Sequence, residues 1–289
     1  MSQPTRPLRA LIAALAAATA VAVGAAGCGS GGNDAGDDST AQRVGRAQAL
    51  AVDRHSGTIL VGTDRGLFRV TPQGGLRRVG AAGRDVTALA FTRDGALLSS
   101  GHPAAGGAAG PADLGLERSD DGGRSWRTIA LRGQADLRLL RASGPLLYGV
   151  NSTTGTVMAT HDAGRHWQVL STPPGLTDLA VDPRAPTALV ASSDSVLWQS
   201  SDGAETWART NGPPGAIAWL ASGRVLVASV DARLHESGDG GRSWTIIGRV
   251  PAPLVALAER RGALLGLLAN GSVVATRDRG GRWELLARG

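Results

Sequence analysis

Three aspartates, Asp113, Asp136 and Asp178, are the carboxylates that the sequence offers for acid–base chemistry. Hydrolysis of a glycosidic bond by two acids needs carboxylates about 5 Å apart in a retaining enzyme, or about 6.5–9.5 Å apart in an inverting one. A site that only binds a polar ligand would use the same side chains together with nearby cations and amides. The candidate residues for either kind of site are His102, Asp113, Arg132, Asp136, Arg138, Asn151 and Asp178.

The histidines and the cysteine do not indicate a metal site. The five histidines have no spacing typical of metal ligands, and Cys28 is the only cysteine in the chain. A single cysteine also excludes a disulfide bond within the chain. We therefore predict no metal, and no residue pattern indicates another cofactor.

Five copies of one eight-residue motif define the elements that must position these candidates. The motif is Ser/Thr-x-Asp-x-Gly-x-x-Trp, and only the third copy departs from it, with Ala204 in place of glycine. The five tryptophans follow one another at intervals of 41, 40, 37 and 39 residues. The motif residues are Ser119, Asp121, Gly123, Trp126, Thr160, Asp162, Gly164, Trp167, Ser200, Asp202, Trp207, Ser237, Asp239, Gly241, Trp244, Thr276, Asp278, Gly280 and Trp283.

Each motif is predicted to close a β-hairpin. Glycine supplies the positive φ that a tight hairpin needs, and aspartate accepts hydrogen bonds from the backbone N–H groups of its own turn. The tryptophan covers the turn and packs inward with a large apolar area. We therefore interpret Asp121, Asp162, Asp202, Asp239 and Asp278 as structural residues, not as catalytic or metal-binding ones.

The repeat of about forty residues also predicts the fold. Each unit contains four short strand-like runs, which in the fourth unit are residues 177–181, 187–192, 195–200 and 206–210. Short, evenly spaced strands with turn signals favour an all-β protein, and four strands in each unit favour a β-propeller. Counting units over residues 43–289, including a first unit that lacks the motif, predicts six four-stranded antiparallel blades. Seven blades are the less favoured alternative.

The alternation of chain direction within a blade predicts two different faces of the ring. Loops between second and third strands, such as residues 101–115, share one face with the links between blades, and we call this side the loop face. The motif hairpins, such as residues 119–126, lie on the other side, the hairpin face. The loop at residues 101–115 is about ten residues longer than its counterparts and carries His102 and Asp113.

The innermost strands offer a second group of polar candidates. At one equivalent position the six units carry Ala49, Ala88, Arg138, Asp178, Ala218 and Ala256. If this position faces the central channel, Arg138 and Asp178 of neighbouring blades can pair there. The two side chains would either bind a polar ligand or only form an ion pair with each other. Arg132, Asp136 and Asn151 can reach the same mouth of the channel.

The N-terminus has the order of a secretory signal, with Arg6 and Arg9 before an apolar run. Cys28 follows Ala25-Ala26-Gly27, which resembles the lipobox of bacterial lipoproteins. That resemblance implies a signal peptide at residues 1–27, a lipid on Cys28 and anchoring at the outer, extracytoplasmic face of the cell membrane. Ordinary signal cleavage and an uncleaved anchor are the alternatives. Residues 28–42 are polar and small and are interpreted as a flexible tether.

The basic residues do not indicate a nucleic-acid partner. All 30 are arginines, and the net charge is +6 at pH 7. They are scattered, with no run that would follow a phosphate backbone. We interpret the charge as a solvated surface, predict no nucleic-acid binding and expect a monomer.

The chain resembles bacterial BNR-repeat lipoproteins, sialidase-like propellers whose repeat is the Asp box and which are commonly labelled glycosyl hydrolases. The stretches that carry the resemblance are residues 62–70, 101–126 and 148–155. It implies that a ligand meets the face opposite the Asp boxes. Sialidases use three arginines, a tyrosine nucleophile helped by glutamate, and an aspartate acid/base. Tyr148 is the only tyrosine here and lies in a predicted strand, and Arg84, Arg132 and Arg138 are the arginines available for such a cluster.

Two functions follow from these observations. The first is a binding or assembly module, displayed at the membrane, that holds a protein or glycan ligand at the channel face. The second is a sialidase-like glycoside hydrolase. The sequence favours the first, because the residue set of a sialidase is incomplete.

Overall fold

The computed structural model describes residues 44–104 and 110–289. The predicted signal peptide, Cys28 and the whole of the predicted tether lie outside the described residues. Among the described residues, no helix is long and apolar enough to cross a membrane.

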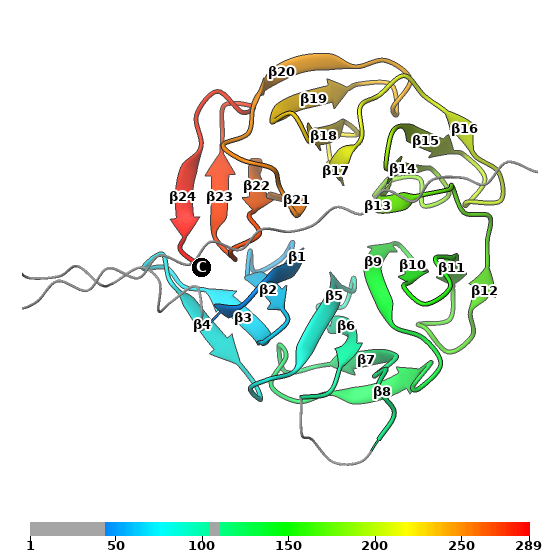
Figure 1. Ribbon diagram of the computed structural model, residues 1–289, viewed down its shortest axis with the longest axis vertical. Helices are drawn as coiled ribbons and strands as arrows, with labels where there is room; N and C mark the ends of the chain where they lie inside the picture. Colours follow the sequence, from blue (N-terminus) through cyan, green and yellow to red (C-terminus); the bar gives the residue numbers. More distant parts are fainter. Residues whose placement is uncertain (1–43, 105–109) are drawn as a thin grey trace, which may run out of the picture. The chain divides into compact units, whose positions relative to one another are not determined.

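Six four-stranded antiparallel sheets, each made of consecutive strands, form a six-bladed β-propeller and confirm the predicted fold (Figure 1). Blade 1 contains β1 (Ala47–Val52), β2 (Ile59–Thr63), β3 (Gly66–Val70) and β4 (Leu76–Val79). Blade 2 contains β5 (Asp85–Phe91), β6 (Leu97–His102), β7 (Leu116–Ser119) and β8 (Arg127–Ala130). Blade 3 contains β9 (Leu137–Ser143), β10 (Leu146–Asn151), β11 (Val157–Thr160) and β12 (Gln168–Val169).

The second half of the ring repeats this arrangement. Blade 4 contains β13 (Leu176–Val181), β14 (Leu189–Ser193), β15 (Leu197–Ser200) and β16 (Ala208–Arg209). Blade 5 contains β17 (Gly215–Trp219), β18 (Val225–Ser229), β19 (Arg233–Ser237) and β20 (Thr245–Arg249). Blade 6 contains β21 (Ala256–Arg260), β22 (Ala263–Leu267), β23 (Val273–Thr276) and β24 (Glu284–Ala287).

The core lies between blades. The first strands β1, β5, β9, β13, β17 and β21 surround the axis of the ring (Figure 1), and the second strands are buried along nearly their whole length. One apolar cluster, for example, joins Leu60 and Leu67 of blade 1 to Val86 and Leu97 of blade 2. A blade therefore covers its apolar faces only by packing against its neighbours.

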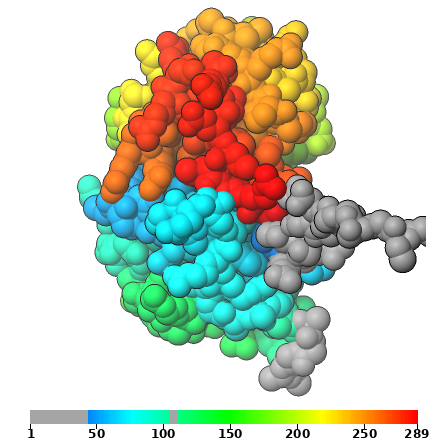
Figure 2. Space-filling view, turned by 90° about the vertical axis from the view of Figure 1, so that its left-hand side faces the viewer, coloured from blue at the N-terminus to red at the C-terminus, as the bar shows by residue number. Residues whose placement is uncertain are grey.

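The ring closes without exchanging a strand. Blade 6 packs directly against blade 1, where the red C-terminal residues lie against cyan and blue ones (Figure 2). The Ala47 N–H donates to the Ala269 carbonyl at 3.0 Å, and the Arg288 N–H donates to the Gly74 carbonyl at 3.1 Å. Val61 and Leu267 pack in one cluster across this seam. Blades 1 and 6 are therefore joined by side-chain packing and a few backbone hydrogen bonds.

Each Asp box is a self-contained set of hydrogen bonds. In the first, Asp121 Oδ1 accepts from the N–H groups of Arg124 and Ser125 at 3.0 Å, and Ser119 Oγ accepts from the Gly123 N–H at 2.7 Å. Such bonds favour the ionised carboxylate. Hydrogen bonds from Ser125 hold the pKa of Asp121 well below its ordinary value, and hydrogen bonds from Thr206 lower the pKa of Asp202 to about 2.

Ala204 shows why glycine is preferred in the box. It has a φ of 74°, and Gly164 at the same place has a φ of 90°. A Cβ on Gly164 would lie 2.2 Å from Leu116 Cδ2 of the preceding blade. In the blade that precedes Ala204, the residue equivalent to Leu116 is Val157. Val157 and Ala204 belong to one buried cluster. The smaller neighbour leaves room for the methyl group.

This difference predicts opposite outcomes for two exchanges. Gly164→Ala should lower the free energy of unfolding by roughly 1–3 kcal/mol, because the methyl group overpacks a rigid site. Ala204→Gly should change it by less than about 1 kcal/mol, because the lost methyl burial is offset by a relaxed left-handed residue. Denaturant unfolding followed by tryptophan fluorescence measures both. Equal losses in the two variants would contradict this account of the box.

Candidate functional site

Three carboxylates converge on His102 at the loop face. His102 ends β6, and its Nδ1 hydrogen-bonds Asp85 Oδ2 at 3.0 Å. Its Nε2 lies 3.6 Å from Asp113 Oδ1 and 3.9 Å from Asp136 Oδ2. The side chains of His102, Asp85 and Asp113 are 37%, 28% and 27% exposed, whereas Asp136 is only 8% exposed. We call His102, Asp85, Asp113 and Asp136 the His102 cluster.

Asp136 is the fixed member of this cluster. Its Oδ1 accepts from the Thr87 hydroxyl of the neighbouring blade at 2.9 Å, and its Oδ2 accepts from the Ser152 hydroxyl at 2.7 Å. Both oxygens are thus engaged in a buried setting. Asp113 has no such anchoring bonds from hydroxyl groups among the described residues, so it is the acid of the cluster with the most freedom to meet a ligand.

Sequence analysis named His102 and Asp113 on the long loop and Asp136 near the innermost strands as separate candidates, and it missed Asp85. Asp85 and Asp136 hold equivalent positions. Each directly precedes the residue that comes just before the bulge in the first strand of its blade, which is Val86 in blade 2 and Leu137 in blade 3. Gln48 of blade 1 donates to Asp85 Oδ1 at 2.5 Å. An alignment of the blade starts would have identified Asp85 alongside Asp136.

The register of the first strands shows why the predicted pair of Arg138 and Asp178 is wrong: Arg138 is the bulged residue of β9 and is equivalent to Thr177. The first strands of four blades each contain one residue that the pairing skips: Gln48, Thr87, Arg138 and Thr177. Leu139, not Arg138, therefore corresponds to Asp178, and the register of β17 likewise makes Ala216, not Ala218, its counterpart. An added residue of this kind shifts every later position of the strand.

Three of the bulged residues reach across to the next blade. Gln48 bonds Asp85, Thr87 bonds Asp136, and Arg138 donates to the Leu176 carbonyl at 2.5 Å. Arg138 is half-buried, and the loss of hydration lowers its pKa although Asp178 opposes that effect. Arg138 therefore links two blades through backbone carbonyls instead of pairing with Asp178.

The partner of Asp178 is Arg141. Arg141 Nη2 lies 2.7 Å from Asp178 Oδ1, and its Nε donates to the Leu179 carbonyl at 2.7 Å. Asp178 Oδ2 accepts from the Ile217 N–H of the following blade at 2.9 Å. Asp178 thus ties β9, β13 and β17 together, and neither oxygen is left for acid–base chemistry.

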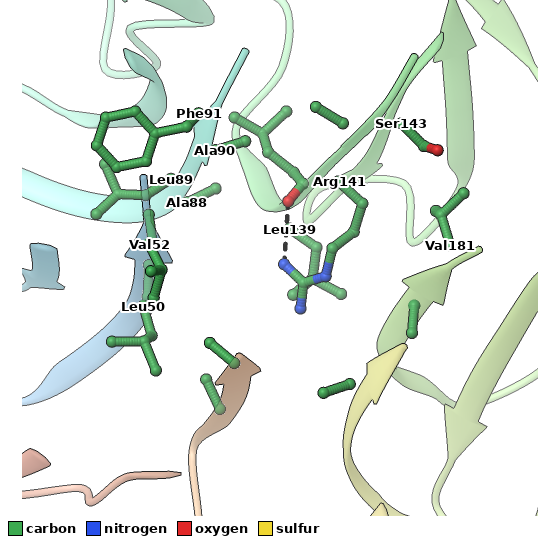
Figure 3. A pocket seen from close by; sticks show the side chains of 18 of the residues that line it. Leu50, Val52, Ala88, Leu89, Ala90, Phe91, Leu139, Arg141, Ser143 and Val181 are labelled. Atoms are coloured by element: carbon green, nitrogen blue, oxygen red, sulfur yellow. Dashed lines mark hydrogen bonds between the residues drawn. The ribbon is translucent and has the colours of Figure 1, made fainter. Parts of the chain in front are cut away.

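Arg141 is one of the residues that line the central channel, a cavity of about 470 Å³. Figure 3 shows its side chain extending into that space. The register of the six first strands places Arg141 in line with an alanine in each of the other blades. These alanines are Ala51, Ala90, Ala180, Ala218 and Ala258.

The remaining candidates do not join the cluster. Asn151 is buried, and its Oδ1 accepts from the Thr153 N–H at 3.0 Å, which closes its own turn. Arg132 is exposed in the turn before β9. That turn is held to the long loop by the Gly133 N–H, which donates to the Asp113 carbonyl at 2.9 Å.

The residues that a sialidase needs are not assembled. Tyr148 is 1% exposed and donates to the Pro186 carbonyl at 3.0 Å, and burial raises its pKa. Arg84 pairs with buried Glu117 at 2.5 Å and lies 4.5 Å from the ring centre of Trp126. Within residues 44–104 and 110–289, no three histidine, cysteine or acidic side chains are grouped so that they could hold a metal ion.

These features define the class of the protein as a six-bladed β-propeller with a polar cluster at one mouth of its channel. No protein-family model matches the sequence, and no curated protein matches it. The chain is similar in structure to a gluconolactonase of Xanthomonas campestris, with a TM-score of 0.64 and 13% identity over 84% of this chain and 87% of that one.

Two further solved structures share the fold. Ycf48 bound to a D1 peptide gives a TM-score of 0.55 at 18% identity, over 84% of this chain and 82% of that one. A xyloglucanase of Xanthomonas campestris from glycoside hydrolase family 74 gives 0.60 at 17% identity, over 86% of this chain and 55% of that one. At these identities the likeness shows the fold, and the function must be argued from the site.

The Arg141–Asp178 pair gives a prediction for stability. Asp178→Ala should lower the free energy of unfolding by roughly 3 kcal/mol, because it leaves a guanidinium and a buried N–H without their acceptor. Adding Arg141→Ala should recover at least about 1 kcal/mol, because five blades already carry alanine there. A double-mutant cycle by denaturant unfolding measures the coupling. Additive losses would contradict a direct pair.

Proposed function

We propose that this protein is a lipid-anchored propeller, displayed outside the cell membrane, that binds a protein or glycan ligand at its loop face. The observation that carries the proposal is the convergence of Asp85, Asp113 and Asp136 on the half-exposed imidazole of His102. Carboxylates and an imidazole at the mouth of a channel can bind hydroxyl, amine or backbone N–H groups of a ligand.

Binding is favoured over hydrolysis because two of the three candidate carboxylates are already engaged in hydrogen bonds within the protein. A two-acid glycosidase needs a proton donor and a second carboxylate that meets the sugar or a water. Both oxygens of Asp178 are taken by Arg141 and backbone N–H groups, and both oxygens of Asp136 accept hydroxyl hydrogen bonds. Asp113 is then the single free acid of the three candidates, and Tyr148 is buried. The hydrolase remains the second candidate, because family 74 hydrolases share the fold.

The propeller structures with a similar fold support a binding role in one respect. The Ycf48 structure contains a bound D1 peptide, so this architecture can present a peptide-binding surface. For the present chain we extend this to a ligand that carries hydrogen-bond donors, since the His102 cluster is rich in acceptors. The partner can be a polypeptide or a glycan, and the experiment below includes both.

The binding proposal predicts a loss confined to the loop face. Membranes are solubilised in detergent, and partners are captured with the full chain, with His102→Gln, with Asp113→Asn and with Glu205→Gln. Each of the two cluster variants should retain less than about one tenth of the captured partner, because a charge-assisted hydrogen bond is lost. Glu205 is an exposed carboxylate in an Asp box on the hairpin face, so its variant should capture as much as the native chain.

A glycan array and a panel of fluorogenic glycosides complete this test. Glycan binding that falls in the same two variants identifies a glycan ligand. Turnover of a glycoside that is abolished by Asp113→Asn and Asp136→Asn would replace the binding proposal with the hydrolase. Equal capture by all four proteins would remove the His102 cluster as the site.

The anchor has a prediction of its own. Cys28→Ala should move the protein from the membrane fraction to the soluble fraction and abolish incorporation of labelled fatty acid, because a thioether-linked lipid has no other acceptor in the chain. Ser30→Ala is the matched control and should stay in the membrane fraction. A Cys28→Ala chain that remains in membranes to the same extent would rule out lipidation as the anchor.

A further inference from the structure

A second cavity lies between blades 5 and 6 on the hairpin face, away from the His102 cluster. It has a volume of about 210 Å³. The turn from β17 to β18 and the turn from β21 to β22 form its two sides, and the fifth Asp box, that of blade 6, closes one end. Its apolar walls are Leu220, Leu226, Ile247 and Leu264.

The rim of this cavity carries more positive than negative charge. Arg224, Arg277 and Arg279 face two carboxylates, Glu236 and Glu259. A single oxygen of Glu236 accepts hydrogen bonds from both Arg224 and Arg279. Glu259 Oε2 accepts from the Ala221 N–H at 2.8 Å and so joins the two turns.

Arg277 is the cation of this rim that remains available. Its side chain is exposed in the Asp box of blade 6. It makes no ion pair with any residue of 44–104 or 110–289. One guanidinium at the mouth of an apolar cavity therefore has all of its donors free, and a second, that of Arg279, shares its acceptor with Arg224.

Arg279 also adopts a backbone conformation that arginine disfavours. Its φ is 61°. The residues at the same place in the other four boxes are Gly122, Ala163, Gly203 and Gly240, which are the smallest side chains. A long side chain in the left-handed region is uncommon, and such outliers gather at functional positions. The box itself does not need an arginine here, because glycine suits this position better.

We propose that the cavity between blades 5 and 6 binds a small apolar carboxylic acid, with its apolar body against the leucines and its carboxylate on Arg277 and Arg279. The apolar walls favour a hydrocarbon or aromatic group, and guanidinium groups pair with carboxylates through charge-assisted hydrogen bonds. The volume is below the range of about 300–1,000 Å³ that suits drug-sized ligands, so the ligand is of the size of phenylacetate. This site is independent of the binding function proposed for the loop face.

Calorimetric titration of the protein with phenylacetate tests the proposal, and phenylacetamide is the neutral comparison. Phenylacetate should bind saturably, and phenylacetamide should bind at least about tenfold more weakly, because it lacks the charge that the guanidinium groups recognise. The His102 cluster does not enter this measurement. A failure of ligand capture at the loop face would therefore leave its result unchanged.

Two variants separate the site from the fold. Arg279→Gly should reduce phenylacetate affinity by about tenfold, while its thermal midpoint stays equal or rises because glycine relaxes the left-handed position. Arg282→Gln, on the same hairpin but outside the cavity, should bind as the native chain does. No saturable binding of phenylacetate, equal affinity for the amide, or unchanged affinity in Arg279→Gly would each overturn the proposal.

Discussion

Apolar packing between neighbouring blades is the interaction on which the rest of the structure depends. Strands such as β2, β14, β18 and β22 are buried at every residue, so both faces of each sheet need a cover. Six such sheets can all cover one another's apolar faces only when they form a closed ring. No blade shares a strand with another, and β1 and β24 belong to different blades. The ring is therefore closed between blades 6 and 1 by the same kind of side-chain packing that joins every other pair of neighbouring blades, with few added hydrogen bonds.

The Asp boxes and the bulges hold this packing in place at opposite ends of the blades. At the hairpin face, each aspartate is engaged by its own turn, and the lowered pKa of Asp202 reflects bonds that only the ionised form can accept. At the loop face, Gln48, Thr87 and Arg138 reach from one blade to the next. Most of the polar chemistry of the chain is therefore structural, including Asp136 and Asp178, which sequence analysis considered for catalysis.

The repeat predicted the number of blades and strands, because a period near forty residues leaves little choice of architecture. It did not predict the register inside a blade. Nothing in the sequence marks Arg138 as the bulged residue of β9, so it was equated with Asp178 instead of Thr177, and the ion-pair partner, Arg141, was not identified. Asp85 was missed for the same reason: equating Ala88 with Arg138 places Asp136 in line with Val86 instead of Asp85. His102 and Asp113 were considered together because one conspicuous insertion carries both, whereas Asp136 was considered with the residues of the innermost strands.

The ring also limits where a new binding function can arise. Channel positions on the first strands admit little variation, since five of six blades carry alanine in line with Arg141. Box positions are fixed by their turns, and inserted side chains there meet a neighbouring blade, as a Cβ on Gly164 would meet Leu116. Strand ends and inter-blade clefts are the places that tolerate unusual residues. Two departures from the repeat at such places, Asp113 beside His102 and the left-handed Arg279, lie at the two surfaces for which we propose ligands. That coincidence follows from the geometry of stacked blades, and it directs the search for ligands to those surfaces.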